Sequence, residues 1–275
     1  MWAHTPWQGR FLPHPLGPDE RLRAYASWCN AVEGNTTFYA TPDARTVASW
    51  ARQTGEDFGF LLKLPRTVTH ERRLAGGEAE LRAFLDAIEP LGPRVAALWV
   101  QLPGSFGPTD LPALAAFLRT LPRTHRVAVE VRHPAFFTHE RAARLLEGVL
   151  RGARAEWVPF DTTVLFAERP VTDAEREAWT RKPRLPRRTR ALTDRPFVRY
   201  IGRDDAERTA EGWRPWIEVF RTWLREGRSP TMFIHTPDNA DALALARRFH
   251  DEVRAGLPEL EPLPEPMPTA PPTLF

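Results

Sequence analysis

The stretch RVAVEVRH at residues 126–133 decides the fold class, because valines occupy every second position from 127 to 131. This alternation predicts a β-strand with one apolar face. Six other short apolar segments resemble it, and longer segments with helical spacing lie between them. The expected strands are residues 31–35, 58–65, 95–103, 126–133, 156–161, 197–202 and 231–237. Strands that alternate with helices predict a parallel α/β protein.

The number of repeats favours a (β/α)8 TIM barrel, for which about 250 residues is a typical length. A doubly wound open sheet is the alternative, but its usual glycine-rich first turn is not visible. The eighth strand should come first in sequence, where only three residues precede His4, so we expect a truncated or missing first strand. We therefore predict one barrel domain over residues 1–255 and a proline-rich, extended tail over residues 256–275.

Composition narrows the class of protein. The 275 residues include 38 basic and 35 acidic side chains, and only Lys63 and Lys182 of the basic ones are lysines. Cys29 is the single cysteine, which excludes an internal disulfide framework and a cysteine-rich metal site. The sequence contains no apolar run of about 18 residues and no signal-peptide pattern at its start. A cytoplasmic protein that does not contact membranes is expected.

The alternation along each strand also predicts which side chains point into the barrel. In residues 126–133 the valines should face the helices, which leaves Glu130 and Arg132 inside. The same reasoning places further polar residues inside: Glu33, Asn35, Lys63, Gln101, Asp161, Arg199 and His235. All of them lie in the C-terminal half of their strands, where barrel enzymes place their active sites. We expect one polar pocket at that end.

The residue types in this pocket predict an enzyme that uses acid–base chemistry on an anionic small molecule, either phosphorylated or carboxylated. Carboxylates, lysines and histidines transfer protons, and arginines bind anionic groups through two parallel hydrogen bonds. The expected catalytic residues are Glu33, Lys63, Glu130, Asp161 and His70. The expected substrate-binding residues are Asn35, Gln101, Arg132, His133, Arg199, Arg203 and His235. Arg203 is included because loops after the seventh and eighth barrel strands often bind phosphate.

Two other interpretations of the same residues stay open. The acidic and basic side chains could neutralise one another in a network that only closes the mouth of the barrel. The carboxylates and His235 could instead bind Mg²⁺ or Mn²⁺, although the neighbouring cations oppose a second positive centre. The favoured prediction has no metal and no cofactor.

A nucleic-acid-binding protein is the alternative function. Residues 181–190 (RKPRLPRRTR) contain six basic side chains and no acidic one, and such a segment can contact phosphates. The net charge of only +3 weighs against this function, since proline-interrupted arginine runs are often solvated loops.

Several motifs together resemble the YecE-like family, a bacterial domain of unknown function numbered 72. They are residues 32–39, 63–66 with Thr69 and His70, 101–108, 129–134, 200–205 and 233–238. The resemblance implies a TIM barrel with a full first strand, which this sequence lacks, and it implies no established substrate. Family members often end in a glutamine-containing Leu-Phe peptide similar to those that bind the replication sliding clamp. Here Leu274 and Phe275 follow two prolines, so they are at most a weak anchor for a partner protein.

Overall fold

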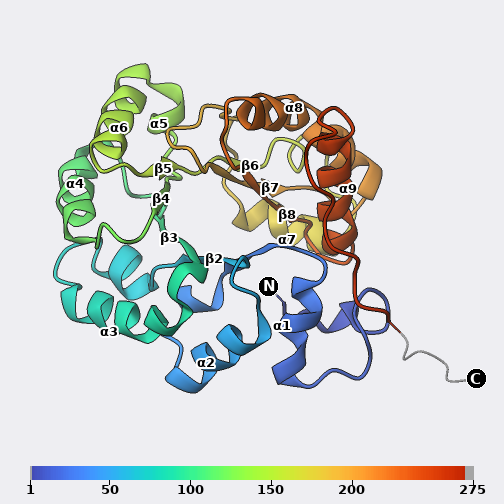
Figure 1. The fold of residues 1–275 in the computed structure, drawn as a ribbon. Helices are drawn as coiled ribbons and strands as arrows, with labels where there is room; N and C mark the ends of the chain where they lie inside the picture. Colours follow the sequence, from blue (N-terminus) through green and yellow to red (C-terminus); the bar gives the residue numbers. More distant parts are fainter. Residues whose placement is uncertain (1, 270–275) are drawn as a thin grey trace, which may run out of the picture.

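Two parallel β-sheets form the centre of the computed structural model, which describes residues 2–269 (Figure 1). The first sheet has the order β1-β2-β3-β4-β5, and the second has the order β6-β7-β8. The strands of the first sheet are β1 Ala31–Gly34, β2 Gly59–Lys63, β3 Val95–Gln101, β4 Val127–Glu130 and β5 Glu156–Trp157. Those of the second are β6 Phe160–Asp161, β7 Phe197–Ile201 and β8 Thr231–His235. The predicted parallel α/β fold is confirmed.

Helices connect the strands and surround them. The α-helices are α1 Pro18–Ala26, α2 Ala44–Gln53, α3 Glu78–Ile88, α4 Leu111–Thr120, α5 Ala135–Thr138, α6 Glu140–Gly152, α7 Asp173–Arg181, α8 Ala206–Arg225 and α9 Ala242–Arg254. Short helical turns are η1 Thr5–Trp7, η2 Thr36–Phe38, the π-helix η3 Thr67–Glu71, η4 Glu89–Arg94 and η5 Pro108–Asp110. Most of the longer helices form a ring around the strands, and α7 lies inside this ring (Figure 1).

Pro159 separates the two sheets. Every predicted strand is present, but the segment at 156–161 is divided into β5 and β6 around this proline. Proline has no backbone N–H to donate, so the hydrogen-bond ladder is interrupted there. Val158 N still donates to Val129 O, and Arg199 N donates to Pro159 O. One continuous segment of chain thus pairs with β4 on one side and with β7 on the other.

Within residues 2–269, β8 and β1 are not paired by backbone hydrogen bonds, which leaves a seam between the two sheets. The two strands lie next to each other, and residues of both line a cavity of about 220 Å³. Residues 2–30 contain no strand of the sheets; instead Trp7 of η1 donates from its indole nitrogen to Asn239 O at 2.9 Å. A missing first strand was predicted and agrees with these residues, whereas closure of the sheets into one barrel stays a prediction.

On one face of the strands, the side chains change from apolar to charged towards the carboxyl ends. The apolar part of this face is a cluster of Leu61, Ala97, Trp99, Ala128, Val158, Phe197 and Phe233. Two positions further along their strands, Leu61, Ala128 and Phe197 are followed by Lys63, Glu130 and Arg199. Because side chains two residues apart share a face of a strand, these charged groups point the same way as the apolar cluster. In these three strands, the charged side chains lie on the face that the alternation of apolar and polar residues predicts.

The tail packs on the protein as far as the structure describes it. Residues 261–269 form no helix or strand. Arg247 donates to Leu263 O and Pro264 O, and Met267 N donates to Ser27 Oγ. Leu274 and Phe275, the predicted partner anchor, lie outside the described residues. No helix within residues 2–269 is long and apolar enough to cross a membrane.

Candidate functional site

Glu33 lies at the centre of a buried cluster of charged side chains at the carboxyl ends of the strands. Its Oε1 is 2.6 Å from Lys63 Nζ of β2, and its Oε2 accepts a hydrogen bond of 3.0 Å from Arg199 Nε of β7. His235 Nε2, at the end of β8, lies 2.8 Å from the same Oε2. Lys63 also donates to Asn35 Oδ1 at 2.8 Å. One carboxylate therefore connects β1 and β2 with β7 and β8, which lie near the other end of the sequence.

Burial and neighbouring charges set the protonation of this cluster. Burial opposes ionisation of Glu33, but Arg199, Lys63 and His235 together hold its pKa well below the usual value. Burial, and then repulsion from Arg199, lowers the pKa of Lys63 to about 8. Burial lowers the pKa of His235 to about 4, although Glu33 favours its protonated form. At neutral pH the cluster holds an ionised Glu33, a Lys63 ammonium that releases its proton readily, and a neutral His235.

Glu130 of β4 brings a second buried carboxylate to the same region. Burial opposes its ionisation, but Arg132, Arg199 and Lys63 lower its pKa. Its Oε1 accepts a hydrogen bond of 2.7 Å from Arg132 Nε. Its Oε2 is buried and has no hydrogen-bond partner among the described residues. A buried carboxylate oxygen without a donor is costly, so it marks a position where a ligand or water can bind.

A cavity of about 230 Å³ lies beside the Glu33 cluster, between the strand ends and α7. Asn35, Arg199 and His235 line it on the strand side. Glu177 and Arg181 of α7, which pair with each other at 2.7 Å, contribute to the opposite wall together with Lys182.

Lys182 was not among the predicted site residues, because its sequence neighbours assigned it to a basic segment. Burial, and then repulsion from Arg199 and Arg132, lowers its pKa to about 8. Within residues 2–269 no hydrogen bond or ion pair of its ammonium group is found. The only available signal in the sequence was its residue type, since Lys63 is the one other lysine.

Three further predicted residues lie at or near this region. Gln101 is buried at the end of β3, in register with Glu130. His70 of η3 is half-buried; burial, and then Arg132 and Arg66, lower its pKa to about 4. His133 accepts a hydrogen bond from Ala135 N and packs against Gly107, so it belongs to the rim rather than to the Glu33 cluster.

The prediction that Asp161 points into the pocket is wrong. Its Oδ2 accepts hydrogen bonds from Trp216 Nε1 of α8 at 2.6 Å and from Arg187 Nε at 2.7 Å. Its Oδ1 accepts from the backbone and the hydroxyl of Thr163. The residue therefore faces the helices and ties α8 to the connection after β6. Its segment has apolar residues on both faces, so alternation could not decide between them.

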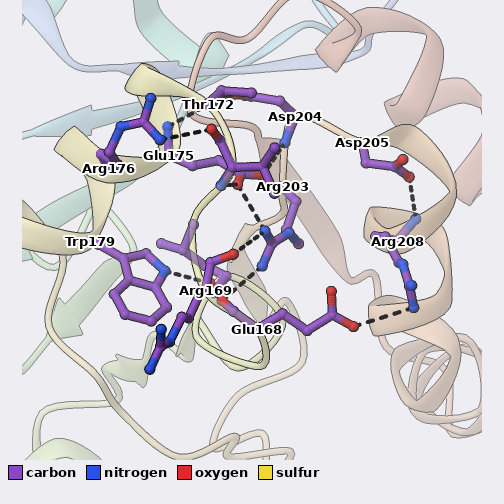
Figure 2. A network of polar contacts seen from close by, with 12 residues as sticks. Glu168, Arg169, Thr172, Glu175, Arg176, Trp179, Arg203, Asp204, Asp205 and Arg208 are labelled. Atoms are coloured by element: carbon purple, nitrogen blue, oxygen red, sulfur yellow. Dashed lines mark hydrogen bonds and ion pairs between the residues drawn. The ribbon is translucent and has the colours of Figure 1, made fainter.

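Arg203, which is expected from the sequence to bind substrate, makes its contacts with the protein itself. Figure 2 shows its guanidinium bonded to Glu168 O, Arg169 O and the Glu175 carboxylate, with the last contact at 2.8 Å. Arg203 is 3% exposed and Glu175 is 2% exposed. The loop after β7 thus uses its arginine to fix α7 and the preceding segment, and both terminal guanidinium nitrogens are already bonded to protein acceptors.

The arginines of residues 181–190 also bind mostly within the protein. Arg187 donates to Asp161, Thr163 and Gly212 O, and Arg188 pairs with Glu147 at 2.9 Å and covers the ring of Trp157. Arg190 pairs with Glu147 as well, at 3.0 Å. This segment anchors the long connection between β6 and β7.

The residues of the alternative metal site, the carboxylates and His235, do not come together as a set of ligands. Asp161 faces away from Glu33, and in residues 2–269 no group of three His, Cys, Asp or Glu side chains could hold a metal ion. Each carboxylate oxygen of Glu33 instead faces a positively charged or imidazole nitrogen.

Comparisons with known proteins identify the family. The family model described as "Protein of unknown function DUF72" matches residues 1–270. The "UPF0759 protein YecE" of Escherichia coli K12 and that of strain O157:H7 are each 36% identical over 264 residues, which cover 96% of this chain and 94% of theirs.

Solved structures of the same family share the fold. A DUF72 family protein of Thermotoga maritima MSB8 superimposes with a TM-score of 0.69 at 23% identity, over 92% of this chain and 96% of that one. A DUF72 family protein of Enterococcus faecalis V583 gives 0.64 at 20% identity, over 87% and 94% of the two chains. The chain therefore belongs to the DUF72 family, whose members include the YecE proteins of Escherichia coli.

Proposed function

We propose that this protein is an enzyme that acts on a small anionic molecule, phosphorylated or carboxylated. The molecule would bind in the 230 Å³ cavity between the strand ends and α7, beside the Glu33 cluster. The observation that carries the proposal is the unbalanced charge around this cavity. In the cavity and the adjacent Glu33 cluster, Lys63, Arg132, Lys182 and Arg199 are positive and Glu33 and Glu130 are negative. Glu177 and Arg181, which also line the cavity, pair with each other and cancel. Lys63, Arg132 and Arg199 each pair with Glu33 or Glu130, whereas Lys182 is half-buried and has no ion-pair partner among the described residues. An inert network would pair all of its cations. An anionic ligand would complete the pairing.

The surrounding residues can divide the work of an acid–base reaction. Lys182 and Arg199, which both line the cavity, would bind the anionic group. Glu130 Oε2, which has no donor within the described chain, would accept a proton from substrate. Lys63 would return a proton, because burial and Arg199 lower its pKa to about 8. His235 would orient Glu33 through their 2.8 Å contact.

We also infer that the strands form one closed barrel, as the family resemblance implies. Support comes from the parallel order of both sheets and from the backbone hydrogen bonds on either side of Pro159. Further support comes from Glu33 of β1, which binds Arg199 of β7 and His235 of β8 across the seam. In a closed barrel the cavity beside Glu33 would occupy the position where barrel enzymes bind substrate.

The test is a thermal-denaturation screen with phosphorylated and carboxylated metabolites. A ligand at about 100 times its Kd should stabilise the protein by about 2.7 kcal/mol, which raises Tm by about 5–10 °C for a chain of this size. Lys182→Met should abolish the shift. Arg190→Met is the matched control, because it removes a charge from the same segment at an exposed position outside the cavity. Absence of any shift across the panel, or an equal shift in Lys182→Met, would count against an anion site.

A further inference from the structure

Lysine is used at only two positions of this chain, and both lie at the Glu33 cluster and its cavity. Of 38 basic residues, all except Lys63 and Lys182 are arginine. Arginine serves as well as lysine where only positive charge is needed, but it does not lose its proton in proteins. A lysine amine can lose its proton and then act as a nucleophile. Two lysines at one site, in a chain that otherwise uses arginine, indicate that the site needs an amine.

The surroundings of the two lysines differ. Lys63 is 2% exposed, and its ammonium group is held by Glu33 at 2.6 Å and by Asn35 at 2.8 Å, 4.7 Å from the centre of the Trp99 ring. Lys63 is not among the residues that line the cavity. Lys182 lines the cavity and has no hydrogen-bond or ion-pair partner among the described residues. Lys182 is therefore the amine that can reach a ligand.

The cavity offers the groups that an amine reaction needs. Arg199 supplies a fixed positive charge for a phosphate or carboxylate, and its own pKa is raised because Glu33 and Glu130 outweigh the effect of burial. His235 is neutral at pH 7 and lines the same cavity, so it can relay a proton. Repulsion from Arg199 and Arg132 adds to burial in favouring the neutral amine of Lys182.

We propose that Lys182 forms an imine with the aldehyde or ketone group of a small anionic oxo compound bound in this cavity. This inference rests on the proposed function and narrows its substrate class to molecules that carry both an anionic group and a carbonyl.

The proposed step is balanced without any further reactant. The lone pair of the neutral Lys182 amine attacks the carbonyl carbon, the carbon–oxygen π bond breaks, and a proton passes from nitrogen to oxygen to give a carbinolamine. Protonation of its hydroxyl and loss of water then leave a carbon–nitrogen double bond. The protonated imine withdraws electrons from the adjacent carbon, which makes a proton there easier to remove.

Reductive trapping tests the proposal directly. The full chain is incubated with glyoxylate, or with glycolaldehyde phosphate, in the presence of sodium borohydride, and the modified lysine is located by peptide mass spectrometry. We expect one stable secondary-amine adduct at Lys182. Lys182→Arg, which keeps the charge, should remove the adduct and retain the circular dichroism spectrum of the folded protein.

An added lysine on the same segment controls for non-specific chemistry. Arg190→Lys places a second amine at an exposed position, and the proposal requires at least tenfold more labelling at Lys182 than there. Absence of an adduct, or equal labelling at the two positions, would overturn the imine proposal. If the anion-dependent thermal shift persists without trapping, only the imine fails; if both are absent, the proposed function fails as well.

Discussion

Two buried clusters of charged residues lie at the carboxyl ends of the strands, and they differ in how completely they are paired. In the cluster around Arg203 and Glu175, the Arg203 guanidinium donates hydrogen bonds to two backbone carbonyls and to the Glu175 carboxylate (Figure 2). Glu175 also accepts from Val171 N and Asp204 N. In the cluster around Glu33, the buried Glu33 Oε1 and Glu130 Oε2 accept no hydrogen bond from the described residues. The half-buried Lys182 beside them has no ion-pair partner there.

The difference separates a structural role from a functional one. Both clusters contain arginine and glutamate, so residue type does not distinguish them. A fully paired network stabilises the fold, whereas a network with unpaired groups beside a cavity lowers stability and remains able to bind a ligand. The predictions below test this contrast.

The largest effect is expected at the paired cluster. Glu175→Ala should lower the free energy of unfolding by about 3–5 kcal/mol, because it leaves the buried Arg203 without its carboxylate. Chemical denaturation measures this loss. Arg208→Ala, which removes an exposed arginine that pairs with Glu168, should cost less than about 1 kcal/mol. A similar cost for the two variants would contradict the structural role of the paired cluster.

A smaller effect is expected at the unpaired cluster, and an anion should reverse it. Glu33→Gln should cost about 2 kcal/mol, because Lys63 and Arg199 lose a charged acceptor. Added phosphate should recover part of this loss, since an anion in the adjacent cavity can offset the excess positive charge. Phosphate should give Glu175→Ala no more stabilisation than it gives the wild type. Denaturation curves with and without phosphate, at constant ionic strength, compare the two variants.

The third prediction concerns pH. The folded protein holds the pKa of His235 at about 4, below the usual 6.5, so the unfolded chain binds a proton first as pH falls. His235 therefore contributes a loss of stability between pH 6.5 and 4. His235→Gln should lose about 2 kcal/mol less than the wild type between pH 7 and 5. Parallel curves for the two proteins would show that His235 is not held neutral by this site.

The smallest expected effect has the opposite sign. Lys182→Met should stabilise the protein by about 0.5–1 kcal/mol at pH 7, because it removes a cation that Arg199, Arg132 and Lys63 repel and that has no ion-pair partner among the described residues. The folded-state pKa of about 8 lies below the usual 10.5, so the wild type gains stability as pH rises from 8 to 10.5. The advantage of the variant should shrink over that range. Unfolding measurements at pH 7 and 9.5 check both statements.

The alternation of apolar and polar residues was sufficient to predict most strands and the residues at the centre of the site. Lys63, Glu130 and Arg199 share a strand face with interior apolar residues, so period-two patterns were sufficient for them. Asp161 was misplaced because both faces of its short segment are apolar and the helices supply its donors. Arg203 and Lys182 depend on the long connection that contains α7, whose position relative to the strands no local pattern encodes.

A calorimetric titration of 2-phosphoglycolate into the wild type and Lys182→Met tests the central claim most directly. We expect binding by the wild type at pH 7 and weaker binding at pH 9.5, because the lysines lose their protons. Affinity should be at least tenfold lower in the variant, which corresponds to about 1.4 kcal/mol. Equal affinity of the two proteins, or affinity that does not change between these pH values, would contradict the central claim.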